Sequence, residues 1–348
     1  QFQFNVLLLL IPILLIMGLS ELIHGLAFRW LEESDALLVS QFGTFGSGML
    51  VFLFAPLLAK VLFSTQRLAD GELRDDLLAI GARHRVNVRD LLLWKTDGTM
   101  INAAVMGLIA PLRYVLITDA LIESMRTDEV RAVMAHEIGH VKRHHIPWMV
   151  LCLIALLAIS DYLVVTPIVW MMGGWEELST DIELWVDMAL SAGILVTVLL
   201  GFGWVSRRFE RQADTFAAQH LSGMAKPGER SSGEAWVITQ DAVNSLQRAL
   251  LTICRLHSVD PNRRSWRHGS ISWRVEYLQS IVGKSIRGLR IDRIIIRIKL
   301  GALACVLMAV AYESSVAFPA VESVPDQESV QTRSSEAATL DDTEPETP

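Results

Sequence analysis

Long apolar stretches alternate with polar segments along this chain, and five of these stretches are candidates to cross a bilayer. They cover residues 4–19, 42–63, 147–172, 184–205 and 294–312. A helix needs about 20 predominantly apolar residues to cross the hydrocarbon, and the second, third and fourth stretches meet that length. The first is short, and the fifth contains Arg297 and Lys299, whose charged ends would have to reach the interface. We therefore predict an integral membrane protein with four spans and a candidate fifth.

Basic residues gather in two segments between these stretches. Segments 64–146 and 206–293 carry 11 and 15 of the 31 lysines and arginines, whereas the short loops 29–41 and 173–183 are acidic. Because segments rich in Lys and Arg stay on the cytoplasmic side, both large segments are predicted to be cytoplasmic. The predicted order is a transmembrane hairpin (1–63), a cytoplasmic part (64–146), a second hairpin (147–205), a second cytoplasmic part (206–293), the fifth span (294–312) and a tail (313–348).

The overall composition agrees with a membrane protein. The 348 residues are 51% hydrophobic with a mean hydropathy of +0.37, which is too apolar for an ordinary soluble domain. No nucleic-acid-binding motif accompanies the basic segments, so nucleic acid is not an expected partner. The three cysteines lack metal or redox spacing. The acidic tail has too few apolar residues for a core and is predicted to be disordered. Since the chain begins with Gln1, further residues are expected upstream.

The segment His136-Glu137-Ile138-Gly139-His140 is the strongest candidate for chemistry. In a helix, residues four apart share a face, so both imidazoles can reach one metal ion. Glu137 lies beside them, placed to take a proton from a zinc-bound water. The alternative is a helix whose two histidines make ordinary hydrogen bonds. The Glu between them favours the metal site.

The residues around this motif predict a helix. Thr127 is the candidate N-cap, and Asp128 and Glu129 follow in the first turn, where the helix dipole favours acids. Apolar residues then recur at helical spacing, at Val130, Val133, Met134, Ile138 and Val141. The motif is therefore expected inside a buried helix.

A zinc ion held by two histidines needs a third protein ligand. The best candidate is Glu210, just beyond the fourth apolar stretch, with Asp214 four residues later on the same helical face. Glu210 can bind the metal while Asp214 accepts a hydrogen bond from a ligating imidazole and fixes the ring. A tight hairpin of the third and fourth spans would bring Glu210 to the histidine motif, since both lie about 10 Å outside the hydrocarbon at 1.5 Å per residue. The alternative for the two acids is a solvated pair among arginines, which the histidine motif at matching depth disfavours.

Taken in order, these motifs resemble the M48 metallopeptidases, the family of the Ste24 CaaX proteases and of the bacterial heat-shock protease HtpX. The resemblance covers roughly residues 64–282 and rests on segments 101–107 (INAAVMG), 113–121 (RYVLITDAL), 135–142 (AHEIGHVK) and 206–214 (SRRFERQAD). It implies a mainly α-helical, multi-span membrane protein with a cytoplasmic, gluzincin-like zinc-peptidase domain that carries a small β-sheet. It also implies one Zn²⁺ per chain, held by His136, His140 and Glu210.

The resemblance implies roles for four further residues. Asn102 and Ala103 match the family's substrate-binding segment on a strand edge, where a side-chain amide can pair with a donor and an acceptor of an extended peptide. His268 and Arg274 match a His and an Arg six apart that polarise the scissile carbonyl or stabilise its oxyanion. Gly269 stands where the family usually has Pro, which weakens this second match. Without the resemblance, Asn102 is equally well a turn residue and His268 a surface histidine.

Two short apolar runs predict the sheet. They are Leu91–Trp94 and Tyr114–Ile117, on either side of the turn Asp97-Gly98. We expect a small sheet near 91–118, with an edge to which the substrate adds in an extended conformation.

Three polar residues near or inside the third span lie outside this predicted site. His144 and His145 follow the motif but fall off its metal-binding face, so we expect them at the membrane boundary. Asp161 lies within the apolar stretch, where an acid is a functional candidate by default. The alternative for Asp161 is a kink near Pro167 with local hydration.

These observations predict a membrane-bound zinc metalloendopeptidase for protein processing or membrane-protein quality control. The expected partners are peptide or protein substrates, membrane-bound or prenylated ones among them, and the lipid bilayer. The expected location is the bacterial inner membrane, with the catalytic domain in the cytoplasm. An intramembrane protease of the site-2 type is one alternative, which Lys142 and Arg143 directly after the motif disfavour. A non-catalytic membrane scaffold is another, which the intact Glu137 disfavours.

Overall fold

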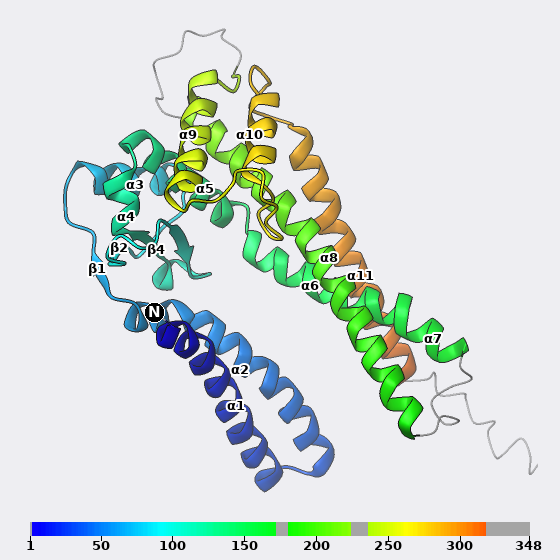
Figure 1. The fold of residues 1–348 in the computed structure, drawn as a ribbon. Coiled ribbons are helices and arrows are strands. Elements are labelled where there is room, and N and C mark those ends of the chain that lie inside the picture. The colour runs from blue at the N-terminus through cyan, green and yellow to red at the C-terminus, as the bar shows by residue number, and fades with distance from the viewer. Residues whose placement is uncertain (1, 172–179, 224–235, 318–348) are drawn as a thin grey trace, which may run out of the picture.

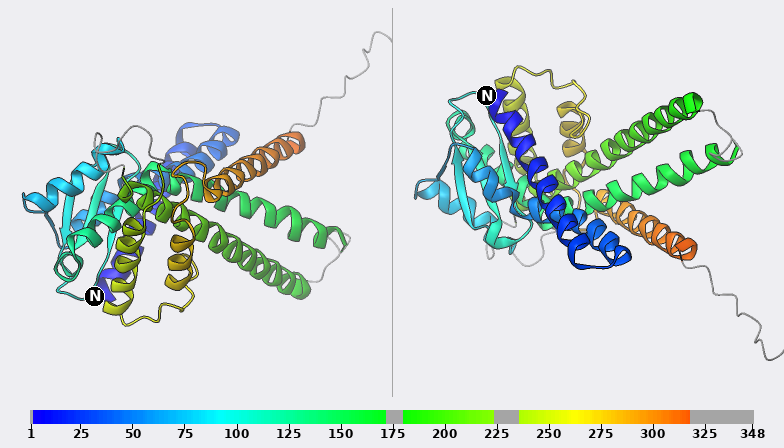
Figure 2. Two further views of the ribbon diagram at one scale, coloured as in Figure 1. Left: turned by 90° about the horizontal axis from the view of Figure 1, so that it is seen from above. Right: turned by 90° about the horizontal axis from the view of Figure 1, so that it is seen from below.

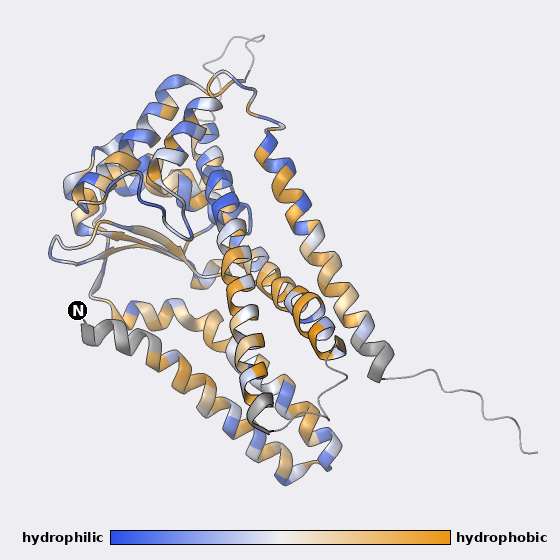
Figure 3. Ribbon diagram, turned by 45° about the vertical axis from the view of Figure 1, so that its right-hand side comes forward, coloured by the Kyte–Doolittle hydropathy of each residue, from blue (hydrophilic) through white to orange (hydrophobic). Residues whose placement is uncertain are grey.

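The computed structural model of the chain describes residues 2–171, 180–223 and 236–317, and helices dominate it (Figure 1). Within these residues, five helices are long and apolar enough to cross a membrane, judged by length and composition: Leu10–Trp30, Glu33–Leu62, His145–Met171, Leu184–Leu221 and Arg290–Tyr312. Each overlaps one of the five predicted stretches, and hydrophobic residues dominate long parts of these helices in Figure 3. The predicted fold class, a helical membrane protein with a small sheet, is confirmed.

The first two long helices form a hairpin. α1 spans Phe2–Trp30 and α2 spans Glu33–Leu62. Figure 1 shows them on the opposite side of the sheet from α9 (Gln240–Leu256) and α10 (Ile271–Ser280). The predicted loop 29–41 is wrong in extent, because residues 33–41 belong to α2. Glu33 and Asp35 lie in the first turn of α2, where the helix dipole stabilises acids. These acids therefore begin a helix instead of extending a loop.

A four-stranded sheet follows the first hairpin in the described part of the chain. Its strands lie in the order β1 (Thr65–Arg67), β2 (Asp90–Trp94), β4 (Tyr114–Thr118) and β3 (Ala103–Met106). The two predicted apolar runs are β2 and β4, which run parallel, while β1 and β3 pair antiparallel at the two edges. The small sheet expected near 91–118 is thus confirmed, and β3 is an edge strand that pairs on one side, with β4.

Five shorter helices surround the sheet and the base of the long helices. α3 (Glu72–Arg83) and α4 (Asp119–Ser124) pack near α5 (Thr127–Lys142), which also contacts β3. α9 and α10 pack on each other and on α8 (Thr180–Leu221). One hydrophobic core joins these elements, with buried members that include Leu77, Leu91, Val115, Ile138, Phe209 and Leu246. A single 3-10 turn, Ala110–Leu112, leads into β4.

The third span contains a local change of helix type. α6 (His145–Ser160) passes through a π-helical turn, Asp161–Val165, into α7 (Thr166–Met171). Pro167 has no N–H to donate, and its ring crowds the carbonyl four residues before it. A π-turn lets the backbone accommodate such a residue, and Asp161 is the residue that opens it. A local distortion near Pro167, the alternative considered for Asp161, is therefore present as a π-turn.

α8 connects the fourth apolar stretch to the globular part without interruption. It spans Thr180–Leu221, a continuous helix of 42 residues, and packs beside α5. α5 does not run on in the same way, because His144 has a φ of 55° and separates it from α6. α6, α8 and α11 (Arg290–Ala317) pack on one another, and Figure 2 shows all three extending away from the sheet.

The candidate fifth span is a long helix. α11 spans Arg290–Ala317, so residues 313–317, predicted as the start of a disordered tail, are helical instead. Residues 318–348 of that predicted tail lie outside the described residues. Lys299 does not extend freely into solvent, because its Nζ donates to the carbonyl oxygen of Arg143 at 3.0 Å. This contact ties α11 to the end of α5.

Gly107 provides a test of the backbone around the edge strand. It follows β3 with a φ of +102°, and a Cβ there would lie 2.3 Å from the carbonyl oxygen of Leu112. A backbone atom cannot rotate away, so Gly107→Ala should add steric overlap to the left-handed strain and lower the free energy of unfolding by about 3 kcal/mol. Thermal unfolding of the purified protein in detergent measures the loss.

Gly98→Ala is the matched control. Gly98 also has a positive φ, +71°, but no atom lies within 4 Å of an added Cβ. That variant should lose only the left-handed backbone cost, about 1–2 kcal/mol. Equal losses for the two variants would show that the contact with Leu112 does not constrain β3.

Candidate metal centre

α5 carries the histidine motif and begins one residue earlier than expected. Its N-cap is Arg126, whose backbone N–H donates to Oε2 of Glu129 at 3.1 Å. The predicted N-cap, Thr127, is wrong: it is the first residue of the helix. A Glu at the third helical position can reach back to the N-cap N–H, so α5 is capped here without a Ser or Thr hydroxyl. Met134 and Ile138 are buried in the core, on the same helix as the two motif histidines.

His136, His140 and Glu210 converge on one point. The Nε2 atoms of the two histidines lie 3.1 Å apart, and they lie 3.6 and 3.7 Å from the carboxylate oxygens of Glu210. Three donors about 2.0–2.1 Å from a tetrahedral zinc ion lie about 3.3 Å from one another, so this set has the dimensions of a metal site. A metal site needs three or more His, Cys, Asp or Glu side chains with their ligand atoms close together. Within the described residues, this set meets that condition, with all its ligand atoms within 4.8 Å of one another.

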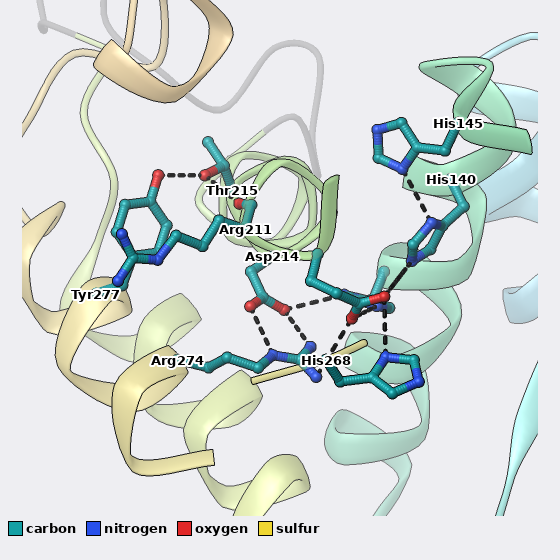
Figure 4. A network of polar contacts seen from close by, with 10 residues as sticks. His140, His145, Arg211, Asp214, Thr215, His268, Arg274 and Tyr277 are labelled. Carbon is teal, nitrogen blue, oxygen red and sulfur yellow. Dashed lines mark hydrogen bonds and ion pairs between the residues drawn. The ribbon is translucent and has the colours of Figure 1, made fainter. Parts of the chain in front are cut away.

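Asp214 and Arg274 contact each other and two of the candidate metal ligands, His136 and Glu210. Oδ1 of Asp214 lies 3.0 Å from Nδ1 of His136, and the guanidinium of Arg274 donates to both oxygens of Asp214, at 2.8 and 2.6 Å. The third guanidinium nitrogen of Arg274 lies 3.5 Å from Glu210, and Figure 4 shows Arg274 facing Asp214. Asp214 is 0% exposed, Glu210 5% and Arg274 6%. These buried charges compensate one another, which buried ions require.

Burial and neighbouring charges set the titration of the motif. Burial lowers the pKa of His136, but contacts with the carboxylates of Asp214 and Glu210 outweigh it and raise that pKa to about 10. Burial, with the positive charge of His136, lowers the pKa of His140 to about 4. Burial raises the pKa of Glu137 to about 7. At neutral pH the ring of His140 is therefore neutral, as a metal ligand must be, whereas a metal has to displace a proton from His136.

A chain of hydrogen bonds leads from His140 to α11. Nδ1 of His145 lies 2.9 Å from Nδ1 of His140, and Nε2 of His145 lies 3.0 Å from Oε1 of Gln212. The amide nitrogen of Gln212 donates to Asp292 at 2.7 Å. The expectation that His145 lies off the metal site is therefore wrong. The break at His144 turns the chain so that His145 faces back toward His140 (Figure 4).

The direction of this chain follows from its ends. The carboxylate of Asp292 only accepts hydrogen bonds, so the amide nitrogen of Gln212 donates to it and the amide oxygen accepts from Nε2 of His145. A neutral His145 then has a bare Nδ1, and Nδ1 of His140 must carry the proton. This tautomer leaves Nε2 of His140 with its lone pair directed at the metal site, the usual arrangement for a ligating histidine.

The other predicted residues lie around the same centre. Nδ1 of His268 lies 3.0 Å from Oε1 of Glu210, and the His268 side chain is 51% exposed. Asn102 directly precedes β3 and is exposed, while its backbone pairs with Thr118. Ala103 is the first residue of β3. The structure thus brings His268 and Arg274 to the ligands, and leaves the Asn102 side chain facing solvent beside the edge strand.

Sequence reasoning missed His145, Gln212 and Asp292. In a continuous helix His145 points away from His140, because residues five apart do not share a face. His145 reaches His140 because the backbone of His144 is left-handed. No residue pattern in the sequence predicts that conformation. Gln212 lies between the two predicted acids of segment 206–214. Its position in that segment was the available signal for a further polar contact.

Comparisons with known proteins agree on one family. Residues 83–281 match the profile described as peptidase family M48. A protease HtpX homolog from Aeropyrum pernix is 25% identical over 215 residues, 61% of this chain and 61% of that protein. A CAAX prenyl protease 1 homolog from Arabidopsis thaliana is 25% identical over 177 residues, 49% of this chain and 42% of that protein. The chain thus spans less than two thirds of the length of either relative.

A solved structure shares the fold. The crystal structure of S. mikatae Ste24p superposes with a TM-score of 0.51 at 19% identity, and the match covers 79% of this chain and 65% of that one. At this identity the likeness concerns the fold alone.

Replacement of His145 tests the hydrogen-bond chain. His145→Asn is too short to reach both His140 and Gln212, so the buried Nδ1–H of His140 loses its acceptor. Affinity for the metal should fall about 10- to 100-fold, as for other residues that orient a ligating histidine. Competition with a chelator of known affinity measures it. His144→Asn is the matched control: His144 is exposed and has a φ of 55°, a conformation that Asn tolerates. Equal affinities in both variants would refute the role of His145.

Proposed function

The chain belongs to peptidase family M48, and from this premise we propose that it is a membrane-bound endopeptidase that hydrolyses peptide bonds with one zinc ion. The observation that carries the proposal is the cluster of His136, His140 and Glu210, with Glu137 beside it on the same helix. Its ligands come from α5 and α8, elements 70 residues apart in sequence, so the cluster is a product of the fold.

The donor atoms favour zinc among divalent ions. Two imidazoles and one carboxylate form the three-ligand set of catalytic zinc sites, which keeps a fourth position for water, whereas Mg²⁺ and Ca²⁺ prefer oxygen donors. Zinc bound there would polarise the substrate carbonyl and lower the pKa of a water. Asp214 would hold the ring of His136 and His145 the ring of His140, so that both Nε2 atoms stay directed at the ion.

We assign the role of general base to Glu137. It follows His136 on α5 and accepts a hydrogen bond from the backbone of Val105 in β3. Its carboxylate therefore lies between the metal ligands and the edge strand. From that position it would take the proton of the attacking water and then deliver it to the leaving amine, which is the general acid–base step that amide hydrolysis needs.

The free edge of β3 supports an extended substrate. β3 pairs with β4 on one side, and an extended peptide can add to an open edge through main-chain hydrogen bonds. Ala103 would supply backbone groups to that peptide. Asn102, whose side chain makes no hydrogen bond within the described residues, would supply an amide donor and acceptor next to it. This arrangement would set the scissile bond against α5.

His268 and Arg274 would then have different tasks. His268 is half-exposed and 3.0 Å from Glu210, so it can turn toward a substrate and help bear the oxyanion charge. Arg274 is buried, and its guanidinium is already paired with Asp214 and Glu210. We infer that Arg274 chiefly fixes the two carboxylates and adds positive charge near the oxyanion.

The charge distribution supports a cytoplasmic site. Segments 64–146 and 206–293 hold most of the lysines and arginines and contain the metal ligands, so by the positive-inside rule both would be cytoplasmic catalytic parts joined by the hairpin 147–205. We propose the bacterial inner membrane as the location, with protein processing or membrane-protein quality control as the role. The relatives named as CAAX prenyl proteases make prenylated peptides one candidate substrate class.

Glu137→Gln tests the chemistry. The amide keeps the size of the side chain but cannot take a proton, so the variant should retain its metal and lose about 10²- to 10⁴-fold in turnover. Metal analysis and cleavage of an unfolded protein substrate by the purified protein measure the two properties. Glu123→Gln, an exposed Glu on α4, is the control and should behave like the unchanged protein. Full turnover by Glu137→Gln would rule out the assigned base.

Cysteine labelling tests where the site lies. Lys142 is exposed two residues after His140, so Lys142→Cys should react with a water-soluble maleimide in inverted membrane vesicles, whose cytoplasmic face is outward. Leu195→Cys, on an exposed face of the apolar part of α8, should stay unlabelled because lipid covers it. A protected cysteine at 142 would instead favour an intramembrane protease.

A further inference from the structure

A polar cavity lies on the far side of α8 from the candidate metal ligands. Its volume is about 710 Å³, and it is lined by α8, the end of α10, the segment 281–289 and the start of α11. Its cationic lining residues are Arg208, Arg211, Lys284, Arg287, Arg290 and Arg293, and we call it the basic pocket. No Asp or Glu is among its lining residues. Figure 4 shows Arg211 and Tyr277 on the side of α8 away from His140, so this cavity is distinct from the metal centre.

The cations of the basic pocket have no ion-pair partner within the described residues, and the carboxylates of Asp214 and Glu276 act on Arg211 only from beyond ion-pair distance. None of the six forms a salt bridge with another residue of the described ranges. Two of them rest on aromatic rings instead: Arg211 lies 3.4 Å from the ring centre of Trp273, and Arg208 lies 4.5 Å from that of Trp204. Stacking holds a guanidinium in place but leaves its N–H groups free to donate in its plane. Nε of Arg211 is buried and has no hydrogen-bond partner.

Such a cavity favours an anion with several oxygen atoms. Six positive charges without an acid around one concave volume raise the local potential, and planar guanidinium groups match phosphate oxygens in pairs. The first N–H groups of α11 lie at the same place, since Arg290 and Arg293 belong to its first turn, and a helix N-terminus also attracts phosphate. The chemistry therefore points to a phosphate group, and a purely apolar ligand does not fit this lining.

The depth of the pocket indicates which phosphate could reach it. Arg208 and Arg211 lie three and six residues beyond Val205, where the fourth apolar stretch ends, or about 5–9 Å at 1.5 Å per residue. Arg293 directly precedes the fifth stretch, 294–312. The headgroup layer of a bilayer is about 5–8 Å thick on each side, so the pocket lies beside it. Basic pockets between membrane helices at this depth suit anionic lipid headgroups.

We propose that the basic pocket binds a phosphate-bearing anion at the membrane boundary, with the headgroup of an anionic phospholipid as the source that its position favours. Basic residues that only orient a protein in the membrane need no common cavity, whereas these six come from two stretches far apart in sequence, α8 and residues 284–293, and line one volume. Bound phosphate would tie α8, α10 and α11 together on the side opposite the metal ligands.

The test uses the full chain in detergent micelles, with native mass spectrometry to count bound molecules. Phosphatidylglycerol is titrated against phosphatidylcholine, which has no net charge, and inorganic phosphate is titrated separately. We expect one phosphatidylglycerol to bind about 10-fold or more tightly than phosphatidylcholine, and added salt to weaken it. Equal binding of both lipids, with no binding of inorganic phosphate, would overturn the proposal. Binding of inorganic phosphate as tight as that of phosphatidylglycerol would support the pocket and identify a free phosphate as its ligand.

Three matched variants locate the binding. Arg287, Arg290 and Arg293 replaced together by Gln should weaken binding about 10- to 100-fold. The same three replaced by Lys should retain most of it, because Lys still binds phosphate as a point charge. The control variant replaces three exposed arginines in the loop before α10 by Gln: Arg263, Arg264 and Arg267. It removes the same charge away from the pocket and should leave lipid binding unchanged. Equal weakening in both Gln variants would refute the site. The readout is lipid binding, so the result is independent of whether the chain hydrolyses peptides.

Discussion

The buried pairing of Arg274 with Asp214 and Glu210 is the interaction on which the metal centre depends. Two carboxylates on one face of α8 repel each other, and burying them without a counter-charge costs several kcal/mol each. Arg274 donates to both oxygens of Asp214 and lies 3.5 Å from Glu210, so one cation from α10 keeps both acids ionised inside the protein. That arrangement leaves Glu210 available as a ligand and Asp214 available to orient His136.

α8 carries both acids of this pairing and connects them to an apolar helix long enough to cross a membrane. It runs without a break from the fourth apolar stretch to Leu221, so the position of Glu210 is fixed relative to the helices around it. Through Gln212 the same helix joins His145 to Asp292 of α11, while its opposite side lines the basic pocket. Rotation or shift of α8 would therefore change the metal ligands, the hydrogen-bond chain and the pocket together.

Local geometry explains what the sequence could predict. The candidate ligands His136 and His140 follow from helical spacing alone, and Glu210 follows from its depth beside a hairpin, so the cluster was predictable before the fold was known. His145 was not, because its position depends on a single left-handed residue, His144. The contact of Gln212 with Asp292 joins helices 80 residues apart, and such pairings arise from packing that no local pattern encodes.

X-ray absorption at the zinc edge tests the central claim, that His136, His140 and Glu210 hold one ion. We expect nitrogen and oxygen neighbours at about 2.0–2.1 Å, with the outer-shell signal of two imidazoles and no sulfur at about 2.3 Å. Glu210→Gln should alter that spectrum, because the amide is a poorer ligand than the carboxylate. A sulfur neighbour, or the same spectrum and zinc content after Glu210→Gln, would rule out this set of ligands.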